Sequence, residues 1–482
     1  MERLSYKTLG ETGRDDYFLE RAPERVLQFG EGNFLRAFVD DFFDIANEKA
    51  GFNGKVVVVS PIEGPLLPKF REQDCLYTLY LRGMEEGKKV EERRLISVIS
   101  RVLDATKEFG EVLSCALNPE LKFIVSNTTE AGIVFRDTDR FDDPEHGSYP
   151  AKLTRFLYER FEKCGGEYAE GFVLLPCELI EENGKNLRRC VLQYAELWDL
   201  GGKFEKWLGE RNTFCSTLVD RIVPGYPKDD ALRYTDENGY EDALLDAAEP
   251  FGFWAIEGDG DLNDVLPFKK AGLPILVTPD ISFYKKRKVW VLNGGHTTMC
   301  TTALLAGLET VGECMEDRDI LGMLEKSEYG EIIPAAPLPE KELMDFAGKV
   351  MDRFRNPFIR HMLMSISLNT TSKWRARVLP SVKNYLAKYG RLPEALLFGF
   401  ASNLMFGISG RFEVKDDPEV LEFFEKHRDD APDELAKAYC GEESFWGEDL
   451  GLIPGFAEKV TDNIRNMRTL GVREALRKVL QK

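Results

Sequence analysis

Over the first 285 residues, short apolar runs alternate with stretches in which apolar side chains recur at helical spacing. The apolar runs are rich in β-branched residues and predict parallel strands covered on both faces, at residues 25–30, 55–60, 121–126 and 171–176. The amphipathic stretches predict helices at residues 33–47, 151–163 and 186–198. This order of strands and helices predicts a doubly wound α/β domain of the Rossmann type.

An inserted hairpin interrupts this order. Residues 76–81 and the segment that begins at residue 88 predict its two strands, with Gly83-Met-Glu-Glu-Gly87 as the connection. Residues 274–278 and 288–292 are the last strand-like runs of the chain.

From Thr297 onward, helical periodicity dominates, and prolines stand near the expected helix starts, where a missing N–H costs little. Helices are predicted at residues 317–326, 341–355, 378–388 and 394–406. We therefore expect two domains. Residues 1–285 form a dinucleotide-binding Rossmann-type domain, and residues 286–482 form an all-helical substrate-binding domain.

The composition of the 482 residues counts against nucleic acid and membranes as partners. Asp and Glu number 83 against 64 Lys and Arg, a net charge of −19, and so acidic a chain repels a phosphate backbone. The N-terminus lacks the apolar core of a signal peptide. No apolar run approaches the ~20 residues that span a bilayer. We therefore expect a cytoplasmic protein.

Cysteine and histidine show no pattern typical of disulfides or metal sites. The nine cysteines are scattered and include no Cys-x-x-Cys pair. No two of the four histidines are close enough in the sequence to form a local metal motif. We expect reduced thiols and no metal ion.

A glycine-rich turn joins the first expected strand to the first expected helix, with the sequence Gln28-Phe-Gly-Glu-Gly-Asn-Phe-Leu-Arg36. In such a turn, backbone N–H groups and the positive end of a helix can hold a pyrophosphate. Leu35 stands where the dinucleotide fingerprint has its third glycine, so an ordinary tight turn remains the alternative. The candidate cofactor-binding residues of this turn are Phe29, Gly30, Gly32, Asn33 and Phe34.

Two further strand ends bear on the cofactor. The strand that ends at Ser60 carries no acidic residue for the ribose of NAD, and Glu63 is the nearest carboxylate, so these residues leave NAD and NADP open. Ser126, Asn127 and Thr128 lie at the carboxyl end of another strand and are candidates for cofactor contact. The alternative for them is a capped helix start.

A lysine, an amide and an imidazole lie within nine residues in Lys288-Val-Trp-Val-Leu-Asn293-Gly-Gly-His296. Asn293 and His296 share one face if this turn is helical. A desolvated lysine can donate a proton to a developing alkoxide, while amide and imidazole donors hold that oxygen. The pattern therefore indicates carbonyl reduction, with a solvated basic run and a structural histidine as the alternative.

The spacing Lys-x-x-x-x-Asn-x-x-His resembles the catalytic signature of the mannitol dehydrogenase family of polyol-specific long-chain dehydrogenases. The glycine turn and Val219-Asp-Arg-Ile222 are also similar to that family. Several longer runs resemble its members that act on sugar acids, at residues 28–40, 126–133, 176–180, 214–224 and 353–357. The resemblance covers nearly the whole chain.

This resemblance implies metal-free hydride transfer with NAD on a small hexulosonate or aldonate. It implies Lys288 as general acid in reduction and general base in oxidation, assisted by Asn293 and His296. Asp220 is implied as an active-site carboxylate, and Lys373 as a lysine that contacts substrate. The expected reaction is the NADH-dependent reduction of tagaturonate to altronate and its reverse, in hexuronate catabolism.

Two departures from the mannitol-type enzymes count against a plain polyol substrate. Ser365 stands where those enzymes carry an arginine, and Glu178-Leu179 stands where they carry Asp-Asn. A uronate-derived substrate adds a carboxylate, which needs a cation to meet it. Lys373 is the first candidate, followed by Arg360 and Arg375, for which surface solvation is the alternative.

The expected site is a basic island in an acidic chain, made up of Lys285 to Lys288, Lys373, Arg375 and Arg377. The stereochemistry of one hydroxyl cannot be read from a sequence, so a fructuronate reductase is an alternative, as is a mannitol-type polyol dehydrogenase. A non-catalytic sugar-acid sensor is the alternative from another class. The residues indicate no oligomeric state.

Overall fold

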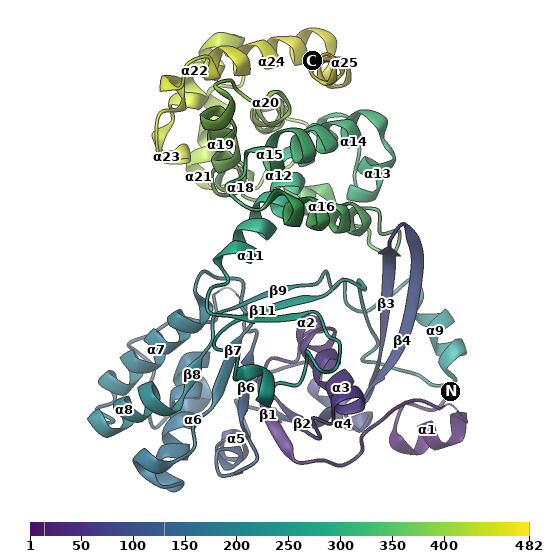
Figure 1. The fold of residues 1–482 in the computed structure, drawn as a ribbon, viewed down its shortest axis with the longest axis vertical. Coiled ribbons are helices and arrows are strands. Elements are labelled where there is room, and N and C mark those ends of the chain that lie inside the picture. The colour runs from purple at the N-terminus through teal and green to yellow at the C-terminus, as the bar shows by residue number, and fades with distance from the viewer. Residues whose placement is uncertain (14, 130, 482) are drawn as a thin grey trace. The chain divides into compact units, whose positions relative to one another are not determined.

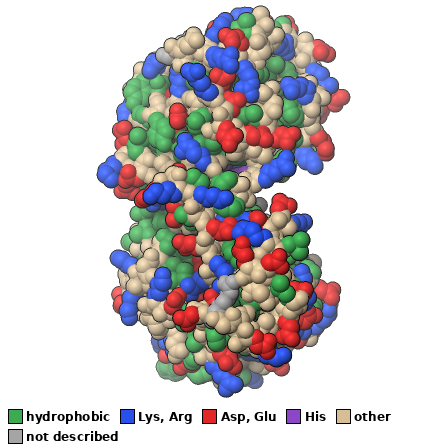
Figure 2. Space-filling view, turned by 90° about the vertical axis from the view of Figure 1, so that its right-hand side faces the viewer, with side chains coloured by type: hydrophobic (Ala, Val, Ile, Leu, Met, Phe, Trp, Pro, Cys, Tyr) green, Lys and Arg blue, Asp and Glu red, His purple; other side chains and the backbone are tan. Residues whose placement is uncertain are grey.

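The computed structural model describes residues 1–13, 15–129 and 131–481. The chain divides into two compact units. Unit 1 comprises Met1–Arg82 and Val90–Ile281, and unit 2 comprises Gly83–Lys89 and Ser282–Lys482. Charged side chains of both signs are interspersed on the surface shown in Figure 2.

A six-stranded parallel sheet forms the centre of unit 1, in the order β5-β2-β1-β6-β7-β8. Its strands are β1 (Glu24–Phe29), β2 (Lys55–Ser60), β5 (Ile99–Asp104), β6 (Phe123–Ser126), β7 (Val173–Pro176) and β8 (Thr213–Phe214). Counted along the chain, this order is third, second, first, fourth, fifth and sixth. That is the order of the Rossmann fold, so the expected fold class is confirmed.

Alternate residues of these strands are buried on opposite faces of the sheet, as the continuous apolar runs predicted. Leu27 and Val57 pack against one helical layer. Figure 1 shows the helices of this layer, which are α5 (Phe109–Cys115), α6 (Tyr149–Lys163), α7 (Asn183–Leu197) and α8 (Gly202–Arg211). Val26 and Val56 belong to the core of the other face. That face is covered by α3 (Val39–Ala50) and by a second sheet, β12-β11-β9, with strands β9 (Thr217–Asp220), β11 (Phe253–Glu257) and β12 (Ile275–Thr278).

Two helices replace the single helix expected at residues 33–47. They are α2 (Asn33–Arg36) and α3, and the chain turns between them at Ala37 and Phe38. The turn buries Phe38 against Phe42 and Trp254, with ring centroids 4.7 and 5.5 Å apart. Tertiary packing thus overrides a continuous helical period.

The inserted hairpin consists of β3 (Tyr77–Glu85) and β4 (Lys88–Ile96), and β3 also pairs with β10 (Asp246–Ala248). The expected five-residue connection was wrong. Both strands extend to a two-residue turn, Glu86-Gly87, with φ of 49° and 73°, because two positive φ angles match the twist of paired strands.

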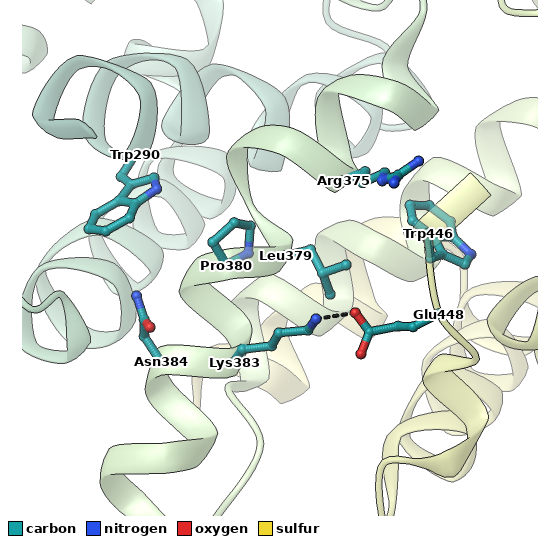
Figure 3. A pocket seen from close by; sticks show the side chains of 8 residues that line it. All are labelled: Trp290, Arg375, Leu379, Pro380, Lys383, Asn384, Trp446 and Glu448. Carbon is teal, nitrogen blue, oxygen red and sulfur yellow. Dashed lines mark hydrogen bonds and ion pairs between the residues drawn. The ribbon is translucent and has the colours of Figure 1, made fainter. Parts of the chain in front are cut away.

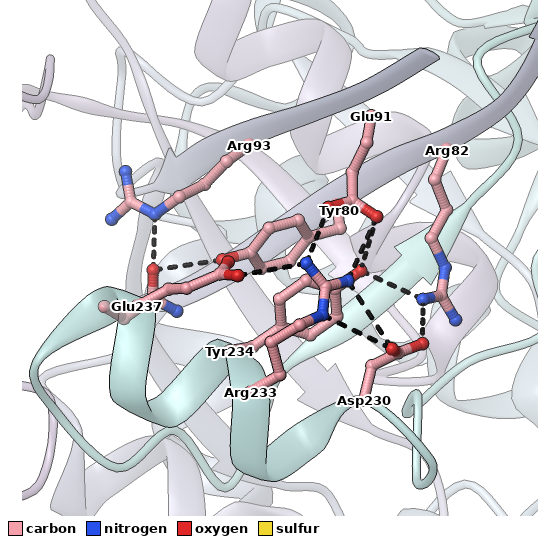
Figure 4. Close-up of polar contacts among 9 residues, drawn as sticks. Tyr80, Arg82, Glu91, Arg93, Asp230, Arg233, Tyr234 and Glu237 are labelled. Carbon is pink, nitrogen blue, oxygen red and sulfur yellow. Dashed lines mark hydrogen bonds and ion pairs between the residues drawn. The ribbon is translucent and has the colours of Figure 1, made fainter. Parts of the chain in front are cut away.

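Helix α9 (Ala231–Asn238) is held on this hairpin by an aromatic and ionic cluster (Figure 4). Tyr234 stacks on Tyr80 with 3.6 Å between ring centroids. Arg233 forms ion pairs of 3.0 Å with both Glu91 and Glu237. The remaining helices of unit 1 are α1 (Tyr6–Thr12), α4 (Leu67–Glu72), α10 (Leu262–Val265) and the short 3₁₀ turns Pro144–His146 and Gly166–Tyr168.

Unit 2 is built from helices. The first half comprises α11 (Ser282–Arg287), the π-helical segment η3 (Lys288–Asn293), α12 (Gly294–Leu305), α13 (Val311–Glu316), α14 (Arg318–Glu325), the π-helical segment η4 (Lys326–Ile332), α15 (Ile333–Ala335), α16 (Glu340–Phe354) and α17 (Leu363–Ile366). The second half comprises α18 (Thr370–Arg377), α19 (Leu379–Tyr389), α20 (Glu394–Ile408), α21 (Pro418–Lys426), α22 (Pro432–Gly441), α23 (Glu443–Trp446), the 3₁₀ turn η5 (Leu450–Leu452), α24 (Phe456–Leu470) and α25 (Val472–Leu480).

Helices α12 and α20 lie in the interior of unit 2, with nearly every residue buried. They approach closely because Gly399 has no side chain. A Cβ at that position would lie 2.8 Å from the carbonyl oxygen of Thr298.

No helix among the described residues is long and apolar enough to cross a membrane.

The strand expected at residues 288–292 was wrong, because this run is the π-helical segment η3. It joins α11 and α12 into continuous helix from Ser282 to Leu305. A five-residue apolar run is compatible with a buried strand or a buried helix, and periodicity alone does not separate them. Here Val291 and Leu292 are buried within the helical unit.

Candidate active site

The loops that follow β1 and β6 lie side by side, where the strand order of the sheet reverses. The backbone N–H of Asn127 donates to the carbonyl of Phe29 at 3.1 Å, and that of Gly30 donates to Val59 at 2.9 Å. Gly30 has φ of +123°, and a Cβ there would lie 3.0 Å from the carbonyl oxygen of Asn127. Open α/β sheets bind ligands at this reversal, so two of the predicted cofactor segments meet at a place suited to a dinucleotide.

Asn33 is held on two sides in the same turn. Its Oδ1 accepts a hydrogen bond of 2.6 Å from Arg36, and its amide abuts Gly225, where a Cβ would lie 2.1 Å from Nδ2. Gly32 precedes it as the N-cap of α2, and space beside its Cα is open. Phe34 stacks on Phe38, 5.2 Å between centroids, which gives it a packing role.

Glu178 organises the loop after β6. From the sequence, Glu178 was identified only as a departure from the mannitol-type enzymes, and no role was predicted for it. Its carboxylate accepts hydrogen bonds from the hydroxyl of Ser126 at 3.1 Å and from both the N–H and the hydroxyl of Thr128 at 3.0 Å. Burial raises the pKa of Glu178. The loop is not a helix start, and two of its polar side chains are used to shape it.

Asp220 is the last residue of β9 and is buried. The next residue, Arg221, is buried too and forms an ion pair of 2.8 Å with Asp41 on α3. Arg221 also donates to the carbonyl of Ala37 at 2.7 Å. The run Val219–Ile222 therefore anchors the end of β9 to α3 and fixes the backbone at Asp220.

The predicted catalytic residues of unit 2 lie along one helix. Lys288 and Asn293 are the first and last residues of η3, and His296 follows in the first turn of α12. Residues five apart in an α-helix point about 140° away from each other. A π-helical turn hydrogen-bonds across five residues and places such residues on the same side, so this turn aligns Lys288 with Asn293.

His296 is buried beside two rings and several cations. Its imidazole stacks on Phe354 with 4.1 Å between centroids, and the ring of His361 meets it edge-on at 5.0 Å. Burial lowers the pKa of His296 well below its ordinary value, and His361, Arg353, Arg377 and Lys373 lower it further. The ring is therefore neutral, and its buried Nε2 has no hydrogen-bond partner among the described residues.

Lys373 and Arg377 lie one turn apart on α18. The ammonium of Lys373 donates to the carbonyl of Ile366 at 2.9 Å, and Arg377 contacts the hydroxyl of Thr297 at 3.5 Å. The sequence analysis expected Arg377 only as a member of the basic island, and its i,i+4 spacing from Lys373 could have singled it out as a neighbour of that lysine. Arg353 could have been found in its motif, whereas no sequence signal pointed to His361.

Arg375 and Arg360, the other carboxylate candidates, have different surroundings. Arg375 projects from another side of α18 into a cavity of about 400 Å³ (Figure 3), lined also by Trp290, Leu379, Pro380, Lys383, Asn384, Trp446 and Glu448. Arg360 is exposed and pairs with Glu309 at 3.4 Å. Within the described structure, no contact joins either arginine to His296.

Residues 24–269 match the family model of the mannitol dehydrogenase Rossmann domain, and residues 280–468 match that of the mannitol dehydrogenase C-terminal domain. The chain belongs to the mannitol dehydrogenase family. Altronate oxidoreductases are similar over 96% of the chain and 98% of their own length, at 43% identity for that of Yersinia enterocolitica and 45% for that of Escherichia coli.

Solved structures confirm the fold of this family member. A ternary complex of Pseudomonas fluorescens mannitol 2-dehydrogenase with NAD and D-mannitol is 22% identical, with a TM-score of 0.74 over the whole of both chains. A substrate-free D-sorbitol dehydrogenase is 23% identical, with a TM-score of 0.83 over 98% of this chain and all of the other. Among the described residues, no three His, Cys, Asp or Glu side chains are grouped to hold a metal ion.

Proposed function

We propose that this family member oxidises altronate to tagaturonate with NAD and catalyses the reverse reduction with NADH. The observation that carries the proposal is similarity to altronate oxidoreductases at 43–45% identity over 96% of the chain. The site in unit 2 fits a substrate with both a reactive oxygen and a carboxylate, since a neutral imidazole lies among several cations. We place this reaction in the cytoplasm, where its nine free cysteines remain reduced.

Bound NAD would accept the hydride in oxidation, and NADH would supply it in reduction. In reduction, Lys288 donates a proton to the oxygen that develops negative charge. The amide of Asn293 and the neutral imidazole of His296 donate hydrogen bonds to that oxygen. In oxidation, Lys288 accepts the proton of the substrate hydroxyl. Asp220 remains our candidate for a further active-site carboxylate.

The substrate carboxylate is assigned to Lys373, with Arg377 and Arg353 beside it. The positive charges of these residues lower the pKa of His296, so a carboxylate bound among them would lie close to the reactive oxygen. A plain polyol has no group that requires such a charge. This is the physical reason for preferring a sugar acid as substrate.

The residues of unit 1 named above fit a dinucleotide. The turn at Gly30 leaves no room for a side chain, and the loops after β1 and β6 are in contact. Phe29, Gly30, Gly32, Asn33 and Asn127 would hold the cofactor, with Ser126 and Thr128 shaping the loop.

The test is NADH depletion with tagaturonate, fructuronate and fructose as separate substrates. We expect tagaturonate to give the highest kcat/KM. A preference for fructuronate would identify the sister reductase, and activity confined to fructose would identify a polyol dehydrogenase. Dinucleotide binding without turnover of any substrate would favour the sensor.

A further inference from the structure

The carboxyl end of β2 is where a Rossmann domain receives the adenosine ribose, and an acidic side chain at that place binds the ribose hydroxyls of NAD. Here β2 ends at Ser60, which has no charge. Glu63 is the nearest carboxylate along the chain. Its side chain is 77% exposed, however, and forms an ion pair with Lys107, so Glu63 is already engaged elsewhere.

A different carboxylate occupies this place. Glu31 belongs to the glycine turn after β1, and its side chain reaches across to the end of β2. A Cβ built on Gly64 would lie 2.6 Å from Oε1 of Glu31 and 2.6 Å from the hydroxyl of Ser60. The carboxylate of Glu31 and the hydroxyl of Ser60 therefore both lie beside Gly64, where a larger residue would displace them.

The surroundings hold Glu31 in position. Its side chain is half-buried and lies beside Ser60, whose hydroxyl donates to the carbonyl of Ile62 at 2.7 Å. Burial raises the pKa of Glu31, while Ser60 and Arg36 act in the opposite direction. The nearby Lys107 is shared between Glu63 and Asp104, at 2.5 and 3.7 Å, so its charge is already compensated by two carboxylates.

We infer that Glu31 selects NAD over NADP, because its carboxylate accepts hydrogen bonds from the 2′- and 3′-hydroxyls of the adenosine ribose and repels a 2′-phosphate. This inference rests on the proposed NAD-dependent function. The same carboxylate thus favours binding of NAD and disfavours binding of NADP. It also explains how the chain works without an acidic residue at the end of β2.

The experiment is a fluorescence titration of the full chain with NADH and with NADPH, without substrate. Wild-type protein should bind NADH at least tenfold more tightly than NADPH. Glu31→Gln keeps the size of the side chain and removes its charge. It should lower that preference by about tenfold or more, through weaker NADH binding and stronger NADPH binding. Glu210→Gln, at an exposed position on α8, is the matched control and should leave the preference unchanged.

The ratio of the two dissociation constants is insensitive to partial misfolding, because inactive protein binds neither dinucleotide. An unchanged ratio in Glu31→Gln would overturn the role of Glu31 and leave the proposed function standing. A wild-type preference for NADPH would also overturn it. Wild-type protein that binds neither dinucleotide would overturn the NAD assignment and the role of Glu31 together.

Discussion

The imidazole of His296 lies against the ring of Phe354, with 4.1 Å between the centroids and 21° between the planes. This apolar wall contributes to the burial that lowers the pKa of His296. A neutral imidazole can donate one hydrogen bond through one nitrogen, whereas a buried imidazolium among cations would be costly. The contact thus keeps His296 in the form that the proposed reaction needs.

Opening this wall should change the pH profile of the reaction. In Phe354→Ser, water reaches the imidazole and the pKa of His296 rises toward its ordinary value, so the ring gains a proton in mild acid. We expect kcat/KM relative to wild type to fall by a further twofold or more between about pH 8 and about pH 6. Phe354→Leu keeps the wall apolar and should follow the wild-type profile. Parallel profiles for wild type and Phe354→Ser would contradict this role.

Lys288 should be essential for chemistry and dispensable for cofactor binding. Loss of a general acid or base lowers the rate by about 10²- to 10⁴-fold. We therefore expect the kcat of Lys288→Ala to fall by about 10²-fold or more. Fluorescence titration should show NADH binding within twofold of wild type. Lys286→Ala removes an exposed lysine of the same basic run and should keep full turnover. Near-normal turnover in Lys288→Ala would refute the mechanism.

Arg377 and Arg375 lie on different sides of α18, and this difference can be measured. Arg377→Met removes a cation beside His296 and should raise KM for a keto-uronate by about tenfold or more, the value of a charged hydrogen bond. The KM for fructose, which has no carboxylate, should change little. Arg375→Met, on the same helix, should leave both constants near wild type. A larger effect at Arg375 would move the carboxylate site to the cavity of Figure 3.

We expect Arg36 to stabilise the folded protein, in addition to holding the side chain of Asn33. It forms an ion pair of 3.4 Å with Asp246, and both side chains are buried. Burial raises the pKa of Asp246 to about 7. Because removal of one partner leaves the other charge buried, Arg36→Met should cost about 3–5 kcal/mol in urea unfolding. The exposed pair of Arg360 and Glu309 supplies the control, and Arg360→Met should cost at most about 1 kcal/mol.

The buried carboxyl group of Glu328 should make the stability of the folded protein depend on pH. Burial raises its pKa well above the ordinary value, and neither carboxyl oxygen has a hydrogen-bond partner in the described part of the chain. The folded state then binds a proton that the unfolded state releases, so stability falls as the pH rises above the unfolded pKa. Glu328→Gln removes this loss.

The check is thermal unfolding of Glu328→Gln and wild type at about pH 5 and about pH 8. The melting temperature of the variant, relative to wild type, should be higher at the upper pH. Glu325→Gln, an exposed site on the preceding turn, should show no such trend. A constant difference across the pH range would exclude a protonated Glu328.

Much of unit 1 could be predicted from residues close together in the chain. The run of four valines at residues 56–59 predicted a strand buried on both faces, and these side chains do pack on opposite faces of the sheet. The turn at Gly30 was identified correctly because a strand and a helix start flank it. Such signals depend on near neighbours, whose side-chain period a sequence displays directly.

Tertiary structure decided what local period left open. Residues 288–292 suit a strand or a helix equally, and packing within unit 2 selected the π-helical turn that aligns Lys288 with Asn293. The environment of His296 depends on Phe354 and His361, which lie 58 and 65 residues further along the chain. The packing of distant segments also determines which side of α18 approaches His296. It likewise brings Glu31 to the end of β2. The sequence by itself therefore determined the order of elements and the chemical types at the site, while long-range packing determined which side chains meet.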